Sequence, residues 1–312
     1  MADGRPSPDQ HALVDGLLAG DELALSRVIS HVENREPGYR EIVERLTDHT
    51  GGARTIGITG PPGAGKSTLV DSLVERYREH EETIGVVAVD PASPYTGGSI
   101  LGDRIRQQAL RSDDGVFFRS MSTRNRAGGL AAATYDAIRA LEAFGKDVII
   151  VETVGAGQNE VDVVKAADTV CVVLFPGAGD DIQANKAGLF EIADTFAVNK
   201  ADLGGATDVV VRLQEMLELG TENGWQPPVV QTVATEGEGV EELVDAFDEH
   251  IRHLQTDDRL RRHRRKQFEH EATLHARECL HSRLDVAVAE LDFDETEESP
   301  HAAARALLEK LS

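Results

Sequence analysis

Residues 60–67, with the sequence GPPGAGKS, constrain the fold of this 312-residue chain more than any other segment. They fit the pattern G-x-x-x-x-G-K-[S/T], whose glycines let backbone N–H groups turn inward around a polyphosphate. The apolar run TIGIT precedes the pattern at 55–59, and a segment with helical apolar spacing follows it at 69–74. A strand, a loop and a helix in that order predict a phosphate site, because the helix adds its positive N-terminal end. The alternative is a chance match in a glycine-rich loop.

The loop and the first helical turn after it supply the predicted nucleotide contacts. Lys66 is expected to reach the outer phosphates and to act in catalysis. Ser67 is expected to place its hydroxyl on a magnesium ion that bridges phosphate oxygens. The complete set of predicted contacts in this segment is Gly60, Pro61, Pro62, Gly63, Ala64, Gly65, Lys66, Ser67 and Thr68.

Short apolar runs alternate with longer mixed segments between Thr55 and Thr232. Runs rich in valine and isoleucine bury both faces, as strands of a parallel sheet do, and the intervening segments are long enough for crossover helices. The sequence therefore predicts an α/β nucleoside-triphosphatase fold with a mainly parallel sheet of about seven strands flanked by helices. The predicted strands are 55–59, 84–89, 116–118, 147–152, 169–175, 195–198 and 229–233.

Helical patterns flank this core on both sides. Apolar residues recur at helical spacing between residues 11 and 50, where Gly20 and Pro37 divide the segment into short helices. No proline occurs between Pro228 and Pro300, and an apolar stripe at four-residue spacing predicts a helical C-terminal arm. Its members are Phe268, Ala272, Ala276 and Leu280. The predicted organisation is an N-terminal helical extension (1–50), a nucleotide-binding domain (51–250) and a C-terminal helical dimerisation arm (251–312).

Three carboxylates are candidates for the magnesium site. Glu152 ends a predicted strand and leads into a segment whose Gly155 offers a backbone amide near the γ-phosphate. Asp90 ends another strand, and Asp103 lies in the polar, glycine-rich segment that follows it, of a type that orders around a triphosphate. Each of the three could instead cap a helix. With Lys66, Asp103 and Glu152 are the predicted catalytic residues, and Ser67, Asp90, Asp103 and Glu152 are the predicted metal ligands.

The motif NKAD at 199–202 indicates which base is bound. Asp202 can accept hydrogen bonds from the ring N–H and the exocyclic amino group of guanine, a pair of donors that adenine does not offer in that arrangement. Asn199 and Lys200 are expected to hold the base edge and the loop, and Ala234 is expected to contact the base through its backbone. A similar sequence, NKAG at 185–188, lacks the carboxylate and follows no strand directly.

Negative charge limits the partners. The chain has 55 acidic and 32 basic residues and a net charge of −23, so neither nucleic acid nor an anionic membrane is a predicted partner. Residues 1–10 hold no apolar segment of signal-peptide length, and no run of about 18 apolar residues occurs. We therefore expect a cytoplasmic protein. The six cations within 259–266, RLRRHRRK, favour a solvated face or a surface that pairs with carboxylates over a nucleic-acid site.

Five segments together resemble the MeaB/ArgK family: GPPGAGKST (60–68), VDPASPYTGGSILGDRIR (89–106), VETVGAGQNE (151–160), PGAGDDIQANKAG (176–188) and NKAD (199–202). Members of this family are GTPase chaperones of the adenosylcobalamin-dependent methylmalonyl-CoA mutase, in the SIMIBI class of P-loop GTPases. The resemblance implies a homodimer that uses GTP and Mg²⁺ to gate cobalamin delivery to the mutase and to protect it, with slow GTP hydrolysis in the absence of the partner.

The resemblance also extends to single positions. Lys66 and Ser67 match the phosphate and magnesium contacts of the family, and Asp90, Asp103 and Glu152 match acidic positions of its nucleotide site. Residues 177–186 match a mobile segment that passes the nucleotide state to the mutase. The switch residues that this implies are Gly177, Gly179, Asp180, Asp181 and Lys186.

Three other functions remain open at this stage. The first is a P-loop kinase or ATPase linked to transport of basic amino acids, although NKAD favours guanine over ATP. The second is a metal-insertion GTPase, but the 11 histidines are scattered, and Cys171 and Cys279 have no near partner in the sequence. The third is a nucleotide-gated scaffold without catalysis, because no residue identifies itself as an activating arginine.

The composition predicts that salt stabilises the fold. Arginine outnumbers lysine by 25 to 7, and only 4% of residues are aromatic, which with the acid excess is typical of halophilic proteins. At molar KCl the screening length falls to about 3 Å, so repulsion among the carboxylates weakens. We expect the melting temperature, measured by circular dichroism, to rise from low salt to molar KCl. A melting temperature that stays constant or falls would contradict the halophile interpretation.

Overall fold

The computed structural model describes residues 8–90, 113–122, 129–153, 158–177, 191–218, 224–290 and 299–311. Seven parallel strands form one sheet in the order β3-β2-β4-β1-β5-β6-β7, which confirms the predicted fold class. The strands are β1 (Arg54–Thr59), β2 (Ile84–Asp90), β3 (Val116–Ser122), β4 (Val148–Thr153), β5 (Thr169–Leu174), β6 (Thr195–Asn199) and β7 (Val229–Thr232).

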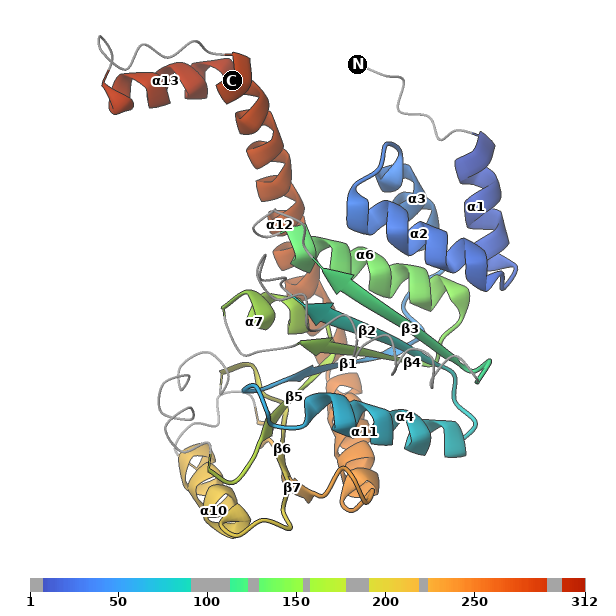
Figure 1. The fold of residues 1–312 in the computed structure, drawn as a ribbon, viewed down its shortest axis with the longest axis vertical. Helices are drawn as coiled ribbons and strands as arrows, with labels where there is room; N and C mark the ends of the chain where they lie inside the picture. The colour runs from blue at the N-terminus through green and yellow to red at the C-terminus, as the bar shows by residue number, and fades with distance from the viewer. Residues whose placement is uncertain are drawn as a thin grey trace.

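Helices cover both faces of the sheet, as Figure 1 shows. On one side lie α4 (Lys66–Glu79) and α11 (Val240–Gln255), and on the other lies α6 (Gly129–Phe144). Alternate residues of the central strand β4 serve the two layers: Val148 and Ile150 pack with α4, whereas Ile149 and Val151 pack with α6. Because successive side chains of a strand point to opposite faces, this two-sided burial explains the unbroken apolar runs in the sequence.

Two glycines show how closely the helices approach the sheet, and a cysteine lies fully buried in the same core. A Cβ atom on Gly85 of β2 would lie 2.9 Å from Leu141 of α6, and one on Gly57 of β1 would lie 2.9 Å from Val164. Cys171 of β5 is fully buried, and burial raises the pKa of its thiol above the ordinary value. It is therefore an ordinary core side chain.

The N-terminal helices belong to the same core. They are α1 (Pro8–Leu18), α2 (Glu22–Asn34) and α3 (Tyr39–Thr47), and their buried side chains pack with α6. Glu33 of α2 accepts hydrogen bonds from the Arg119 guanidinium at 2.5 Å and from the Ser122 N–H at 3.1 Å, both on the edge strand β3. The extension therefore covers α6 and is anchored to one edge of the sheet.

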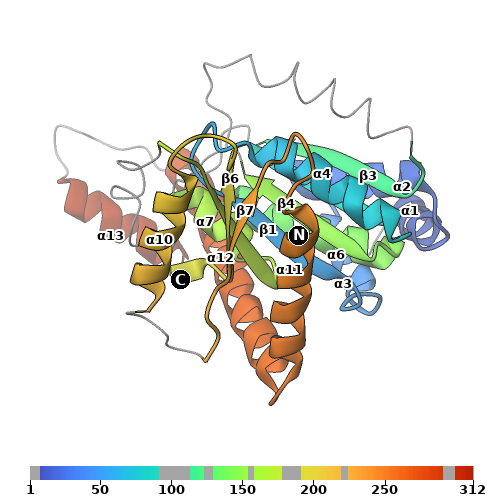
Figure 2. The ribbon, with the colours of Figure 1, turned by 90° about the horizontal axis from the view of Figure 1, so that it is seen from below.

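The C-terminal arm consists of α12 (Arg259–Glu290) and α13 (Pro300–Leu311). Figure 2 shows α11 and α12 side by side and joined at one end; α11 continues to Gln255, so residue 250 lies inside a helix. The side of α12 that faces the core buries Glu271 and Leu274. In contrast, Phe268 is 65% exposed and Leu280 54% exposed, so these two ends of the predicted apolar stripe face away from this chain's own core.

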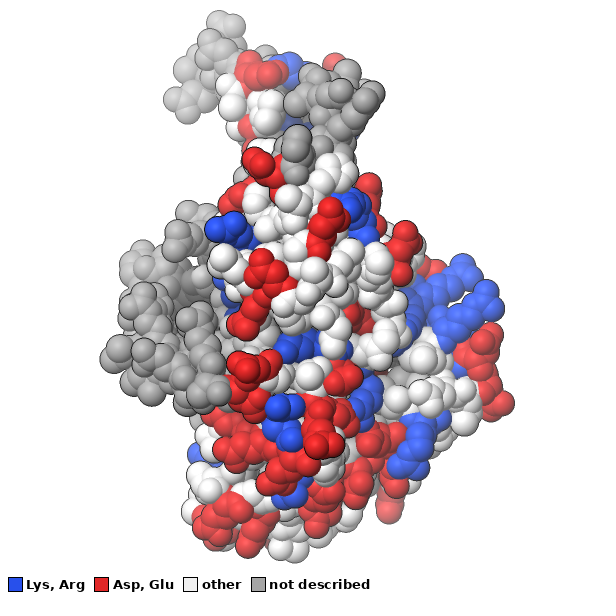
Figure 3. Space-filling model, turned by 90° about the vertical axis from the view of Figure 1, so that its right-hand side faces the viewer, with Lys and Arg blue, Asp and Glu red and all other residues white. Residues whose placement is uncertain are grey.

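Charge covers the surface unevenly. Acidic side chains gather over the lower part of the face drawn in Figure 3, with fewer basic side chains among them. The basic stretch 259–266 begins α12, and among its cations Arg264 pairs with Asp168 at 3.1 Å and Arg265 pairs with Glu269 at 3.0 Å. These contacts fit the expected pairing with carboxylates. Within the described residues, no helix combines the length and apolarity that a membrane span requires.

Candidate nucleotide-binding site

The loop between β1 and α4 lies where the parallel strands end. Gly60 has φ +146°, and a Cβ atom there would lie 2.1 Å from the carbonyl oxygen of Val173 on the neighbouring strand β5. Gly65 has φ +85°, and a Cβ atom there would lie 2.4 Å from Nδ2 of Asn199. Only glycine fits either position without displacing its neighbour, because these conformations and contacts exclude a side chain.

Lys66, the first residue of α4, contacts this loop through its side chain. Its side chain is buried, and Nζ donates hydrogen bonds to the carbonyl oxygens of Gly60 at 2.8 Å and Pro61 at 3.0 Å. Pro62, Gly63, Ser67 and Thr68 are exposed around it. The ammonium group is therefore positioned by the loop backbone, next to residues that solvent can reach.

The structure brings Ser67 and Glu152 together. Ser67 is the second residue of α4, and its hydroxyl donates a hydrogen bond to Oε1 of Glu152. Glu152 is 4% exposed and lies on β4, which pairs with β1 so that Glu152 is opposite Ile58. The sheet order therefore juxtaposes a hydroxyl and a carboxylate oxygen beside the phosphate loop, and Mg²⁺ prefers oxygen ligands of this kind.

The other predicted ligands are less fully described. Asp90 is the last residue of β2, which pairs with β4. Its backbone therefore lies near Glu152, where the carboxyl ends of these two strands meet. Asp103 lies outside the described residues. Of the predicted switch segment, Gly177 is exposed with φ +98° after the end of β5. The rest of that segment, Gly179, Asp180, Asp181 and Lys186, lies outside the described residues, as does the NKAG sequence at 185–188.

Asn199 connects the NKAD motif to two neighbouring loops. Its Nδ2 donates to the Ala64 carbonyl oxygen at 2.9 Å. Its Oδ1 accepts from the Thr232 hydroxyl at 3.2 Å and from the Ala234 N–H at 3.1 Å. We predicted that Asn199 and Lys200 hold the base edge and the loop, and the contacts of Asn199 join the phosphate loop to the segment after β7. Nothing local in the sequence indicates Thr232 as a partner, because this contact arises only when β6 and β7 lie side by side.

Lys200 makes a second connection to the phosphate loop. Its backbone is left-handed, with φ +59°, and its Nζ donates to the Gly63 carbonyl oxygen at 2.8 Å. The same Nζ lies 5.1 Å from the centre of the Phe175 ring, within range of a cation–π contact. Asp202 is exposed two residues further on, where its carboxylate is accessible to a base.

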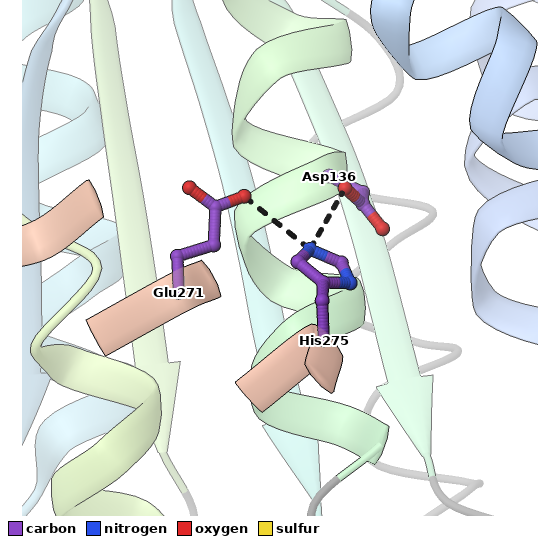
Figure 4. Close-up of side chains that lie close together, drawn as sticks. All are labelled: Asp136, Glu271 and His275. Atoms are coloured by element: carbon purple, nitrogen blue, oxygen red, sulfur yellow. Dashed lines mark ion pairs between the residues drawn. The ribbon is translucent and has the colours of Figure 1, made fainter. Parts of the chain in front are cut away.

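A separate cluster of possible metal ligands contains Asp136, Glu271 and His275 (Figure 4). His275 Nε2 lies 3.7 Å from Asp136 and 3.4 Å from Glu271. However, Arg35 donates to Asp136 at 2.6 Å, and Arg139 donates to both oxygens of Glu271. Two guanidinium groups already pair with these carboxylates and would repel a further cation. We interpret the cluster as an ion-pair junction that joins the end of α2 to α6 and α12.

Comparisons with known proteins agree on one family. Residues 25–289 match the family described as "Methylmalonyl Co-A mutase-associated GTPase MeaB". A Pyrococcus abyssi protein named as a GTPase is 46% identical over 310 residues, which cover 96% of each chain. GTPase ArgK of Escherichia coli is 34% identical over 261 residues, which cover 80% of this chain and 78% of ArgK.

Two further similarities agree with this match. A mouse protein named "Methylmalonic aciduria type A homolog, mitochondrial" is 33% identical over 256 residues, which cover 76% of this chain and 62% of the mouse protein. A solved structure described as "LAO/AO transport system kinase" superposes with a TM-score of 0.69 at 24% identity, covering 98% of this chain and 99% of the other, and shows the same fold. The chain therefore belongs to the MeaB family of P-loop GTPases, which bind and hydrolyse GTP.

Proposed function

We propose that this GTPase is a chaperone that gates cobalamin delivery to an adenosylcobalamin-dependent methylmalonyl-CoA mutase and protects that enzyme from inactivation. The observation that carries the proposal is the match of residues 25–289 to a family whose name joins a GTPase to this mutase. The name of the mouse relative refers to the same branch of metabolism and supports the proposal. GTP hydrolysis then serves as the timing step, slow until the partner completes the site.

We assign the chemistry to the phosphate loop and to the predicted magnesium ligands. Mg²⁺ would neutralise phosphate charge, held by Ser67 and Glu152 with Asp90 and Asp103 as further acidic ligands. Lys66 sits in the loop with its ammonium on backbone carbonyl groups, and it would stabilise negative charge on the outer phosphates. The adjacent Ser67 hydroxyl and Glu152 carboxylate supply the oxygen-rich corner that such an ion requires.

Guanine recognition is assigned to Asp202, with Asn199, Lys200 and Ala234 completing the base site. An exposed carboxylate can accept from both N–H donors on one edge of guanine. The contacts of Asn199 with Ala64 and of Lys200 with Gly63 support this assignment, because they fix the base-recognition motif relative to the phosphate loop.

Two further roles depend on a partner, namely the nucleotide-dependent switch and dimer formation. We assign the switch role to residues 177–186, which follow β5 in the sequence. We assign dimer formation to the C-terminal arm, because Phe268 and Leu280 expose apolar surface that a second subunit could bury. Together these assignments describe a homodimer whose nucleotide state is read by the mutase.

The carboxylate of Glu152 is expected to act in turnover more than in affinity. Glu152→Gln keeps the shape of the side chain but removes the charge beside Ser67, so we expect GTP turnover to fall about 10- to 100-fold. GDP affinity, measured by calorimetry, should change far less. Glu75→Gln, on the exposed side of α4, is the matched control and should behave like the unmodified chain. Unchanged turnover in Glu152→Gln would remove Glu152 from the proposed magnesium site.

The apolar stripe of α12 is expected to form the dimer contact. Leu280→Asp places a charge on an apolar position that is 54% exposed in the single chain, so a buried dimer contact there should be lost. Light scattering should give twice the 33.7 kDa chain mass for the unmodified protein and the single mass for the variant. Thr273→Asp, at another exposed position of α12, should remain dimeric. A monomeric unmodified protein, or a dimeric Leu280→Asp, would contradict this contact.

The mutase is expected to shift nucleotide affinity. A partner that prefers one nucleotide state must change the affinity for that nucleotide by the same factor by which the nucleotide changes partner affinity, typically about fivefold or more. We expect saturating methylmalonyl-CoA mutase to change GDP or GTP affinity by such a factor and to change GTP turnover. Heat-denatured mutase is the control. If affinity and turnover both stay constant with native mutase, the chaperone proposal fails.

A further inference from the structure

The peptide groups of Ala234 are held on both sides by side chains of other elements. Its N–H donates to Asn199 Oδ1 at 3.1 Å, and its carbonyl oxygen accepts from the Ser72 hydroxyl at 2.6 Å. Ala234 is 5% exposed and follows β7 in a tight turn that a bridge between Val233 and Glu238 closes. These two contacts fix the orientation of the two peptide groups that flank Ala234.

Ser72 belongs to α4, the helix whose first residues contribute to the phosphate site. It lies six residues beyond Lys66 in α4, which corresponds to about 9 Å along the helix axis. The Ser72 hydroxyl also lies 3.1 Å from the Thr68 carbonyl oxygen, a contact within the helix that serines commonly make. The shorter contact with Ala234 instead crosses between two elements far apart in the sequence. One rigid helix therefore carries Lys66 and Ser67 at its start and supports the Ala234 turn one to two turns later.

The Ala234 turn is the segment that we assign to the guanine base. Guanine carries a carbonyl oxygen at the ring position where adenine carries an amino group, so a backbone N–H placed there favours guanine. The Ala234 N–H is bonded to Asn199, so the N–H that the Ser72 contact orients is that of Thr235, which shares one planar peptide group with the Ala234 carbonyl. Selectivity of this kind depends on direction, because hydrogen bonds weaken steeply as their geometry departs from linear. A side chain that fixes the Ala234 backbone thereby influences which base is accepted without touching the base.

We propose that Ser72 is a positioning residue for guanine selectivity, acting through the carbonyl group of Ala234. The inference rests on the proposed base site at Asp202 and Ala234. Asn199, which also donates to Ala64, braces the turn from the side of the NKAD motif, and Ser72 braces it from α4. The two braces set the position of the base-contacting turn relative to the phosphate loop. Loss of the Ser72 brace weakens guanine binding and leaves the phosphate contacts intact.

The test compares GDP and ADP binding by the full-length protein with Mg²⁺, using titration calorimetry. Ser72→Ala removes one hydrogen bond, so GDP affinity should fall about threefold to tenfold. ADP affinity should stay constant, so the ratio of the two affinities should fall by the same factor. Ser72→Thr keeps the hydroxyl and should retain the ratio of the unmodified protein. Thr273→Ala removes a hydroxyl that bonds the Glu269 carbonyl oxygen within α12 and should change neither affinity.

Three results would overturn the inference. These are an unchanged ratio in Ser72→Ala, an equal loss of GDP and ADP affinity, and a reduced ratio that Ser72→Thr fails to restore. If Ser72→Ala melts at a lower temperature, Ser72→Cys replaces it, because a thiol fills the position of the hydroxyl and is a weaker donor. The ratio should then fall in the cysteine variant, and an unchanged ratio there also overturns the inference. Equal GDP and ADP affinities in the unmodified protein would instead remove the guanine assignment itself.

Discussion

The hydrogen bond from Asn199 Nδ2 to the Ala64 carbonyl oxygen joins two loops that start from different strands. Both residues are buried, so loss of either partner would leave a polar group without water, at a cost of about 1–3 kcal/mol. The contact also explains Gly65, since a Cβ atom there would lie 2.4 Å from the same Nδ2. The left-handed turn at Gly65, the start of α4 and the position of the NKAD motif are therefore one arrangement, which none of the three segments would hold alone.

Much of the fold follows from the sequence because both faces of a parallel sheet must be apolar. All seven predicted strands exist, and with one exception their ends lie within one residue of the prediction. β3 is the exception: it continues to Ser122, whereas its apolar run ends at Phe118. As an edge strand it can carry Arg119, whose guanidinium is paired by Glu33 from a distant helix. No local pattern announces such a partner.

The contacts of the site are likewise of two kinds: those that the local sequence predicts and those that depend on which elements become neighbours. The meeting of Ser67 and Glu152 can be anticipated, because each residue lies at the end of an element that the sequence defines, and neighbouring parallel strands end at one edge. The contacts of Ser72 and Thr232 cannot be anticipated, since their partners depend on which elements become neighbours. The buried polar side chain of α12 cannot be anticipated from the local sequence either, because Glu271 is buried where Arg139 of α6 pairs with it.

α12 is one uninterrupted helix of 32 residues, about 48 Å long. Gln267 donates to the Ala167 carbonyl oxygen, and the N-terminal helices reach the same helix through Arg35 to Glu278 and Arg40 to Cys279. Beyond Cys279 the helix continues for about 16 Å toward α13, and Figure 1 shows it extending away from the sheet. A rod held along about two thirds of its length behaves as a lever. A small change in the tilt of α12 on the core would displace α13 by a larger distance. That distance increases with the length of helix that extends beyond the contacts with the core.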